Sequence, residues 1–379
     1  MLRNVNFTKE HELFRKSFSK FVDNEVVPYY GEWDERGIVP REFYKKMGDH
    51  GYLCPWVEEK YGGVGADFLY SAIIIEEFGR KGLFCFSFVH SDVIAPYIAT
   101  FGTNEQKDKW LPGCTSGDIL LAIAMTEPDA GSDLASLRTK AVKDGSHYIL
   151  NGSKVFISNG QSADLVVVAA KTDPGAGANG ISLFLVERGT PGFESGKRIE
   201  KIGLHVQDTT ELFFEDCRIP KSNLIGKEGY GFKYLMNKLQ QERLLVAIAA
   251  QALSERCLQL TVDYVKERKV FRKSLGSFQN TQFTLAEIAT EVQVGRCFLD
   301  AIVNQHIAEQ DLIQEVSMAK FWICETLNKS AYRCLQLFGE YGVCREYEIS
   351  RIWCDARIQS IYAGTSEIMK LLISRGLGL

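Results

Sequence analysis

The chain has 379 residues, and its 44 Lys and Arg against 48 Asp and Glu give a net charge of −4. This balance argues against nucleic acid as a partner, because phosphate binding needs clustered positive charge. With 45 % hydrophobic and 24 % charged residues, the composition is that of a soluble globular protein. Two or three domains are expected, because single hydrophobic cores rarely exceed about 250 to 300 residues.

Membrane spans and targeting signals are not expected. The longest apolar runs, at residues 165–170 and 244–250, are much shorter than the roughly 20 residues of a membrane-spanning helix. The first residues are charged and amphipathic and lack the pattern of a signal peptide. We therefore expect a cytoplasmic protein without a membrane partner.

The ten cysteines lack the spacing of a metal site. No CxxC pair occurs, and ten helical steps would turn successive members of the series Cys324, Cys334, Cys344 and Cys354 in different directions. We interpret these four as buried small apolar residues in a reducing compartment. The histidines show no HExxH or other ligand spacing, so no metal is expected.

Residues 1–117 carry a helical pattern and are predicted to form an N-terminal all-α domain. Thr8 is placed to cap a helix whose apolar residues follow three- and four-residue steps. The glycine-rich stretch 61–65 has no strand before it and no GK[ST] motif after it. A loop between helices is therefore preferred there to a phosphate site.

Residues 118–228 change to a period of two and are predicted to form a middle β domain. The segments 165–170, 181–186 and 211–214 have the composition of strands, and Asn-Gly and Asp-Gly turns separate such segments. Many short strands with tight turns indicate an antiparallel barrel or sandwich. Residues 229–379 return to long helices, at 231–271, 281–304 and 311–339, and are predicted to form a C-terminal helical bundle. The fold class is α+β.

Glu242 is the one candidate for chemistry that the pattern itself selects. It falls within a stripe of apolar residues formed by Leu235, Leu239, Val246 and Ala249. Burial raises the pKa of a carboxyl group and makes it a candidate proton acceptor. The alternative is that Glu242 pairs with Arg243 or another cation, or lies at a subunit contact.

The loop 124–133, with the sequence AMTEPDAGSD, is a second candidate. Its hydroxyls and backbone N–H groups could hold a flat, hydrogen-bonding ligand. The alternative is a surface turn rich in Pro, Asp and Gly. No GxGxxG motif follows a strand, so no Rossmann nucleotide site is indicated.

Five motifs resemble hallmarks of the acyl-CoA dehydrogenase family and occur in its order. They are AMTEPDAGSD at 124–133, NGSKVFISNG at 151–160, ERKVF at 267–271, CLQLFGEYG at 334–342 and IYAGTSEIMKLL at 361–372. They extend over nearly the whole chain. The resemblance implies an N-terminal α-helical domain, a middle β domain and a C-terminal four-helix bundle.

The resemblance also implies an activity, the FAD-dependent oxidation of an acyl-CoA thioester to its trans-2-enoyl form. A Glu removes the α-proton while the β-hydrogen leaves as hydride to flavin N5. Most members carry this Glu immediately before a Gly-Thr near the C-terminus, where this chain has Ala363. The long-chain and isovaleryl-CoA dehydrogenases carry it on the first helix of the C-terminal domain, and the matching residue here is Glu242.

Further site residues follow from the resemblance. The residues expected to contact FAD are Ile123, Met125, Thr126, Gly131, Ser132, Phe156, Ser158, Arg268, Phe271, Gln279, Gln336, Leu337, Phe338, Gly339, Thr365 and Glu367. The residues expected near the thioester substrate are Ser132, Gln240, Arg243, Tyr362 and Gly364. In the family, the groups that match Arg268, Gln279 and 336–339 reach the FAD of a neighbouring subunit, so a homotetramer is expected. Arg272, Glu340 and Gln240 depart from the common family residues.

Three hypotheses remain open at this point. The first is an acyl-CoA dehydrogenase that passes electrons to electron-transfer flavoprotein. The second keeps the chemistry but acts on an acyl or aminoacyl group tethered to a carrier protein, with oxygen as an alternative acceptor. The third is a flavin-free relative retained as a binding or assembly protein.

Overall fold

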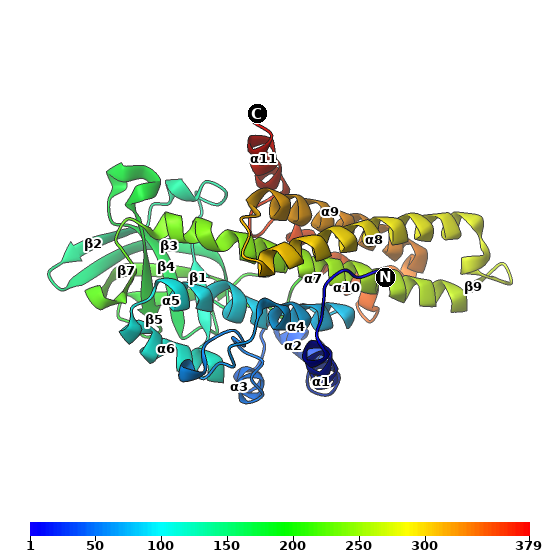
Figure 1. Ribbon diagram of the computed structural model, residues 1–379, viewed down its shortest axis with the longest axis horizontal. Helices are drawn as coiled ribbons and strands as arrows, with labels where there is room; N and C mark the ends of the chain where they lie inside the picture. Colours follow the sequence, from blue (N-terminus) through cyan, green and yellow to red (C-terminus); the bar gives the residue numbers. More distant parts are fainter.

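The computed structural model describes residues 1–379, with helices at both ends of the chain and a sheet between them (Figure 1). The first helices are α1 (Lys9–Glu25), α2 (Tyr30–Arg36), α3 (Arg41–Asp49), α4 (Phe68–Arg80), α5 (Ala95–Phe101) and α6 (Asn104–Ser116). Thr8 caps α1 as predicted, because its side chain accepts a hydrogen bond from the His11 backbone N–H at 3.3 Å. The stretch 61–65 leads from the short 3-10 helix η1 (Glu59–Tyr61) into the loop before α4, as predicted.

The middle zone is an eight-stranded sheet. Its strands are β1 (Leu121–Ala124), β2 (Lys140–Asp144), β3 (His147–Ser158), β4 (Leu165–Lys171), β5 (Ile181–Glu187), β6 (Phe193–Arg198), β7 (Thr209–Pro220) and β8 (Leu224–Ile225). They are ordered β6-β7-β3-β2-β4-β5-β8, with β1 paired to β4. Most of the strand pairs are antiparallel, as predicted, but β1 runs parallel to β4 with Leu121 opposite Leu165, and β2 also meets β4 in parallel, at Lys140 and Lys171. The uninterrupted apolar run of β4 is typical of a strand covered on both faces, and such strands accept parallel neighbours.

The C-terminal zone is a helical bundle, as predicted. Its helices are α7 (Gly231–Glu267), α8 (Gln279–Ile307), α9 (Ile313–Phe338), α10 (Glu348–Gln359) and α11 (Ser366–Gly376). α7 has 37 residues, or about 55 Å at 1.5 Å per residue. It runs from the sheet to the hairpin of β9 (Lys269–Val270) and β10 (Lys273–Ser274) at the far end of the bundle (Figure 1).

The two helical zones share one hydrophobic core. Phe18 and Phe78 of the first zone belong to the same buried cluster as Leu244 and Leu253 of α7. Every residue of α7 from 242 to 254 is buried, so this part of the helix is surrounded by protein on all sides and does not bury only one face. No helix is long and apolar enough to cross a membrane.

A cluster of buried charges ties the chain's start to this core. Glu76 of α4 is 2 % exposed and pairs with Arg296 at 2.9 Å, Arg15 at 3.0 Å and Arg3 at 3.1 Å. Burial alone would raise the pKa of Glu76, but these arginines and Arg80 together hold it well below its usual range. Glu76 is therefore an ionised structural group.

The cysteines follow the prediction only in part. All ten are free, and Cys324 and Cys334 are buried. Cys344 and Cys354 are partly exposed, which corrects the interpretation of all four as buried. The difference arises because Cys344 follows the short helix η7 (Gly339–Val343) and Cys354 lies on α10, outside the central helices.

Candidate active site

Glu242 is buried in the middle of the molecule without an ion pair. Its side chain is 5 % exposed, and its Oε1 accepts a hydrogen bond of 2.7 Å from the Tyr97 hydroxyl of α5. Burial raises its pKa to about 7, although the Tyr97 hydrogen bond and the charges of Arg243 and Lys238 act in the opposite direction. The alternative of a salt bridge to Arg243 is not found, and such a carboxyl can both hold and release a proton near neutral pH.

The turn at residues 362–365 lies against Arg243, the residue that follows Glu242 in α7. Arg243 Nε donates to the Ala363 carbonyl at 3.3 Å, and the buried Lys320 of α9 donates to the Gly364 carbonyl at 2.5 Å. Ala363 has a φ of +52° and Gly364 of +94°, so this turn uses left-handed backbone that glycine adopts readily and alanine rarely does. Ala363, the other position that the family resemblance offers for the base, therefore contacts Arg243, the residue that follows Glu242 in α7.

The residues expected near the substrate lie in three places. Arg243 lies against the turn that contains Tyr362 and Gly364. Gln240 instead points to the segment between α8 and α9, where its Nε2 donates to the Gln310 carbonyl at 3.1 Å and its Oε1 accepts from the Leu312 N–H at 2.8 Å. Ser132 is exposed on the loop after β1.

That loop and the middle of β3 lie side by side. The Val155 N–H donates to the Thr126 carbonyl at 2.9 Å, which brings Met125 and Thr126 beside Phe156. Phe156 sits at a break in the β3–β7 register, has a φ of +59° and exposes 64 % of its surface. An aromatic ring held outward by strained backbone fits a flat apolar ligand such as an isoalloxazine.

A buried ion pair between Lys154 and Glu127 holds the loop that follows β1 in place. Lys154 is fully buried, and its Nζ contacts Glu127 Oε1 at 2.8 Å and the Met125 carbonyl at 3.2 Å. Glu127 also accepts from the backbone N–H groups of Arg138 and Thr139. Lys154 and Glu127 therefore fix the shape of the loop, while Gly131 and Ser132 remain on its exposed side.

The remaining residues expected around FAD split between two places. Thr365 caps α11 by accepting from the Ile368 N–H, and Glu367 is exposed in the first turn of that helix. Arg268 and Phe271 lie past the far end of α7, 26 residues beyond Glu242 or about 39 Å along the helix.

The far end of α7 is also where residues 336–339 lie. Tyr264 stacks on the Phe338 ring at 4.0 Å, and the Arg268 guanidinium lies over Tyr341 at 5.3 Å. The Phe338 side chain is thus buried within its own chain, whereas Phe271 is 90 % exposed and Arg268, Gln279, Gln336 and Gly339 are also exposed. One chain does not bring this group to the loop after β1.

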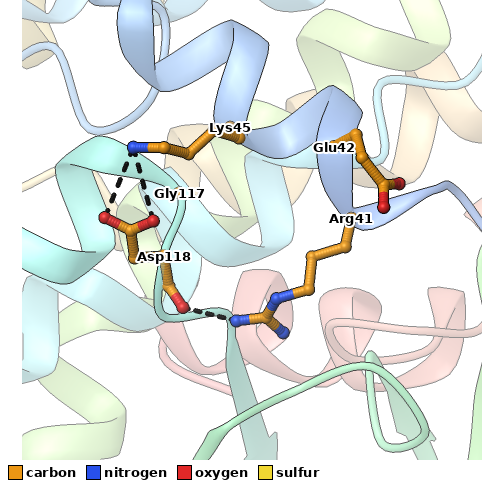
Figure 2. Close-up of a pocket in the computed structure, with 5 residues that line it drawn as sticks. All are labelled: Arg41, Glu42, Lys45, Gly117 and Asp118. Atoms are coloured by element: carbon orange, nitrogen blue, oxygen red, sulfur yellow. Dashed lines mark hydrogen bonds and ion pairs between the residues drawn. The ribbon is translucent and has the colours of Figure 1, made fainter.

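A separate cleft of about 270 Å³ lies between α3 and the end of α6. It has no apolar lining, and Figure 2 shows Lys45 directed to the Asp118 carboxylate and Arg41 to the Asp118 carbonyl. Arg41 also pairs with Asp164 at 2.5 Å. Arg41 and Lys45 are thus both paired, and the cleft has no apolar surface that suits an acyl chain.

Sequence reasoning missed two groups at the site, Tyr97 and Lys154. Nothing in the sequence around Tyr97 signals a contact 145 residues away. Lys154 did carry a signal, because it continues the inward positions Tyr148 and Leu150 of β3, and a lysine on a buried face needs an acidic partner.

Comparison with known proteins covers nearly the whole chain. The acyl-CoA dehydrogenase N-terminal domain matches residues 8–118, the middle domain residues 122–217 and the C-terminal domain residues 229–378. The mitochondrial long-chain specific acyl-CoA dehydrogenase of Sus scrofa is 48 % identical over 372 residues, 97 % of this chain and 86 % of that protein. An acyl-CoA dehydrogenase of Bacillus subtilis is 39 % identical over 98 % of both chains. A crystal structure of an acyl-CoA dehydrogenase from Geobacillus kaustophilus is 54 % identical with a TM-score of 0.97, over 98 % of this chain and 99 % of that one.

Two further solved structures concern the cofactor and the carrier. A glutaryl-CoA dehydrogenase from Mycobacterium smegmatis in complex with FADH2 is 30 % identical with a TM-score of 0.91, over 98 % of this chain and 95 % of that one. A prolyl acyl carrier protein oxidase is 32 % identical with a TM-score of 0.93, over 99 % of this chain and 100 % of that one. Matches to all three domains and to full-length relatives show that the chain belongs to the acyl-CoA dehydrogenase family.

Proposed function

We propose that the chain catalyses the α,β-dehydrogenation of an acyl-CoA thioester, with Glu242 as the acceptor of the α-proton. The observation that carries this proposal is a buried carboxyl without an ion pair, with a pKa of about 7, whose neighbour Arg243 contacts the 362–365 turn. An α-proton of a thioester is weakly acidic, so its removal needs a placed base whose pKa lies near the working pH. Glu242 meets both requirements.

FAD is the proposed cofactor. The outward Phe156 ring, the Met125–Thr126 backbone beside it and Ser158 would hold the flavin ring, and Arg268 of a neighbouring chain would meet the pyrophosphate. When bound, FAD supplies the acceptor for the hydride that leaves the β-carbon. The glutaryl-CoA dehydrogenase structure with FADH2 supports a flavin for this fold.

The assembly and the electron acceptor belong to the same proposal. Phe271 and Arg268 are exposed far from the loop after β1, which supports a homotetramer in which one chain completes the cofactor site of another. We propose electron-transfer flavoprotein as the acceptor. The ten free cysteines support a reducing compartment such as the cytoplasm.

The direct test is anaerobic bleaching of the bound flavin by acyl-CoA thioesters of different chain length. Bleaching of the wild-type protein and its loss in Glu242→Gln are expected. A purified protein that is colourless and takes up no FAD would contradict the proposal and favour the flavin-free binding protein.

The similarity to a prolyl acyl carrier protein oxidase favours a second candidate, a dehydrogenase or oxidase of carrier-tethered groups. Parallel assays with acyl-CoA and with acyl carrier protein thioesters, each with a dye or oxygen as acceptor, separate the two. Faster flavin reduction by the carrier-bound substrate would select the second candidate.

A further inference from the structure

One buried contact joins the N-terminal helices to the proposed base. Tyr97 lies on α5, which continues directly from the π-helix η2 (Val89–Ile94). Its side chain is fully buried, and its hydroxyl donates to Glu242 Oε1 at 2.7 Å. No other group of the chain donates a hydrogen bond to this carboxylate, so Oε2 has no partner. Burial raises the pKa of Tyr97 well above its usual value, and the phenol therefore keeps its proton.

We propose that Tyr97 is a positioning residue for proton abstraction: its hydroxyl anchors one oxygen of the Glu242 carboxylate and leaves the other free to take the α-proton. This inference rests on the proposed role of Glu242 as the base. A glutamate side chain has several rotamers, and a hydrogen bond to its charged group holds the one that directs Oε2 to the reacting carbon.

A phenol suits this task better than a cation would. Glu76 shows what arginines do to a carboxyl at the same depth, because they hold its pKa well below the usual range and leave it a poor base. Without any donor, burial would keep Glu242 protonated at neutral pH. The Tyr97 hydroxyl favours the ionised form and adds no charge, so Glu242 stays both ionisable and basic near pH 7.

The charged neighbours on α7 itself, Lys238 and Arg243, act on Glu242 only through their charge. The titratable groups on the other elements around α7 are bonded elsewhere: Asp92 of η2 to Ser71, His306 of α8 to Gln240, Lys320 of α9 to Gly364, Asp355 of α10 to the Leu204 N–H, Tyr362 to Gln359, and Glu76 and Glu77 of α4 to arginines. Tyr97 is therefore the group whose removal changes the ionisation of Glu242 without removing a charge.

The test compares Tyr97→Phe with a matched control, Tyr148→Phe. Tyr148 is also fully buried and also donates to a glutamate, Glu228, at 2.7 Å, but it lies on β3 away from the base. Both substitutions remove one hydroxyl and keep the ring. Flavin-loaded protein is selected by its visible absorbance, and thermal unfolding checks that each variant is folded.

The first readout is the pH dependence of flavin reduction in a single anaerobic turnover. A lost hydrogen bond to a charged group shifts a pKa by about one unit, so the acid limb of the Tyr97→Phe profile should move up by about one pH unit. Below that limb the rate should fall about tenfold, with the dissociation constant of the substrate unchanged. Tyr148→Phe should keep the wild-type profile.

The second readout needs no turnover. The infrared band of the protonated Glu242 carboxyl, identified by its absence in Glu242→Gln, should titrate at higher pH in Tyr97→Phe than in the wild type. If the acid limb and the infrared band of Tyr97→Phe coincide with those of Tyr148→Phe, the role of Tyr97 is refuted. Full flavin reduction by Glu242→Gln would instead refute Glu242 as the base, which is a separate result.

Discussion

Glu76 and Glu242 are two carboxylates at similar depth in helices that pack together, and their surroundings give them opposite properties. Glu76 is 2 % exposed and meets three arginines within 3.1 Å. Glu242 is 5 % exposed and meets one phenol. Arginines lower the first pKa, whereas burial raises the second to about 7. Burial alone therefore does not identify a functional acid; the absence of a charged partner does.

The largest expected effect comes from removing the base. In Glu242→Gln the rate of flavin reduction by substrate should fall about 10²- to 10⁴-fold, because the amide cannot accept a proton. Stability should stay the same or rise, since a buried ionisable group without an ion pair is lost. Stopped-flow bleaching and thermal unfolding measure the two effects. Unchanged bleaching would place the base elsewhere.

Removing a cation from the charge cluster around Glu76 should lower stability strongly and leave the rate of flavin reduction nearly unchanged. Arg296 is 1 % exposed and contacts Glu76 at 2.9 Å and Glu255 at 2.6 Å. Arg296→Met removes the ion-pair partner of Glu255 and one of the three arginines closest to Glu76. It should lower the free energy of unfolding by about 3–5 kcal/mol, with little change of flavin reduction in the folded protein. The more exposed Arg333→Met is the control and should cost less than about 1 kcal/mol in urea unfolding. Equal losses of unfolding free energy in Arg296→Met and Arg333→Met would contradict the prediction that the buried cluster contributes more.

The pH dependence of stability should have opposite signs at the two residues. The pKa of Glu242 is raised from 4.5 to about 7 in the folded protein, so between these two pH values the folded state binds a proton that the unfolded state has lost. The contribution of Glu242 to stability therefore falls by about 3 kcal/mol as the pH rises from 4.5 to about 7. The folded pKa of Glu76 is lowered, so its contribution is present above its unfolded pKa and is lost as pH falls. Melting temperatures of wild type, Glu242→Gln and Glu76→Gln across this range test both signs. Parallel slopes would contradict them.

The smallest expected effect is a gain. The double variant Glu242→Gln/Ala363→Glu should reduce flavin about tenfold faster than Glu242→Gln alone. The reason is that the Ala363 carbonyl already lies against Arg243, the neighbour of the original base. The left-handed backbone at Ala363 limits how well the new side chain is placed. Single-turnover bleaching of the double variant measures the recovery. No recovery would show that the 362–365 turn does not reach the α-carbon.

Much of the fold was predictable because it depends on local pattern. The cap at Thr8, the strands at 165–170 and 181–186 and the three long helices follow from periodicity and turn residues, although the first helix ends at Glu267 and not at residue 271, because a short hairpin begins there. The parallel pairing of β1 with β4 was not, because strand direction is set by how distant segments pack.

The candidate site divides in the same way. The burial of Glu242 was predicted from its apolar neighbours in the chain. Its hydrogen bond to Tyr97 was not, since two residues 145 positions apart leave no trace in a single sequence. The exposure of Phe156 depends on a register break that no turn motif marks.

The π-helix η2 sets the direction in which α5 presents its side chains. A π turn holds about one residue more than an α turn, and deleting one residue within Val89–Ile94 would restore α geometry. Every side chain of α5 would then be turned by about 100° relative to the chain before it. The Tyr97 hydroxyl would leave Glu242, although no residue at the site had been replaced. The ionisation of Glu242 thus depends on the number of residues in η2 as well as on the types of residue around its carboxyl group.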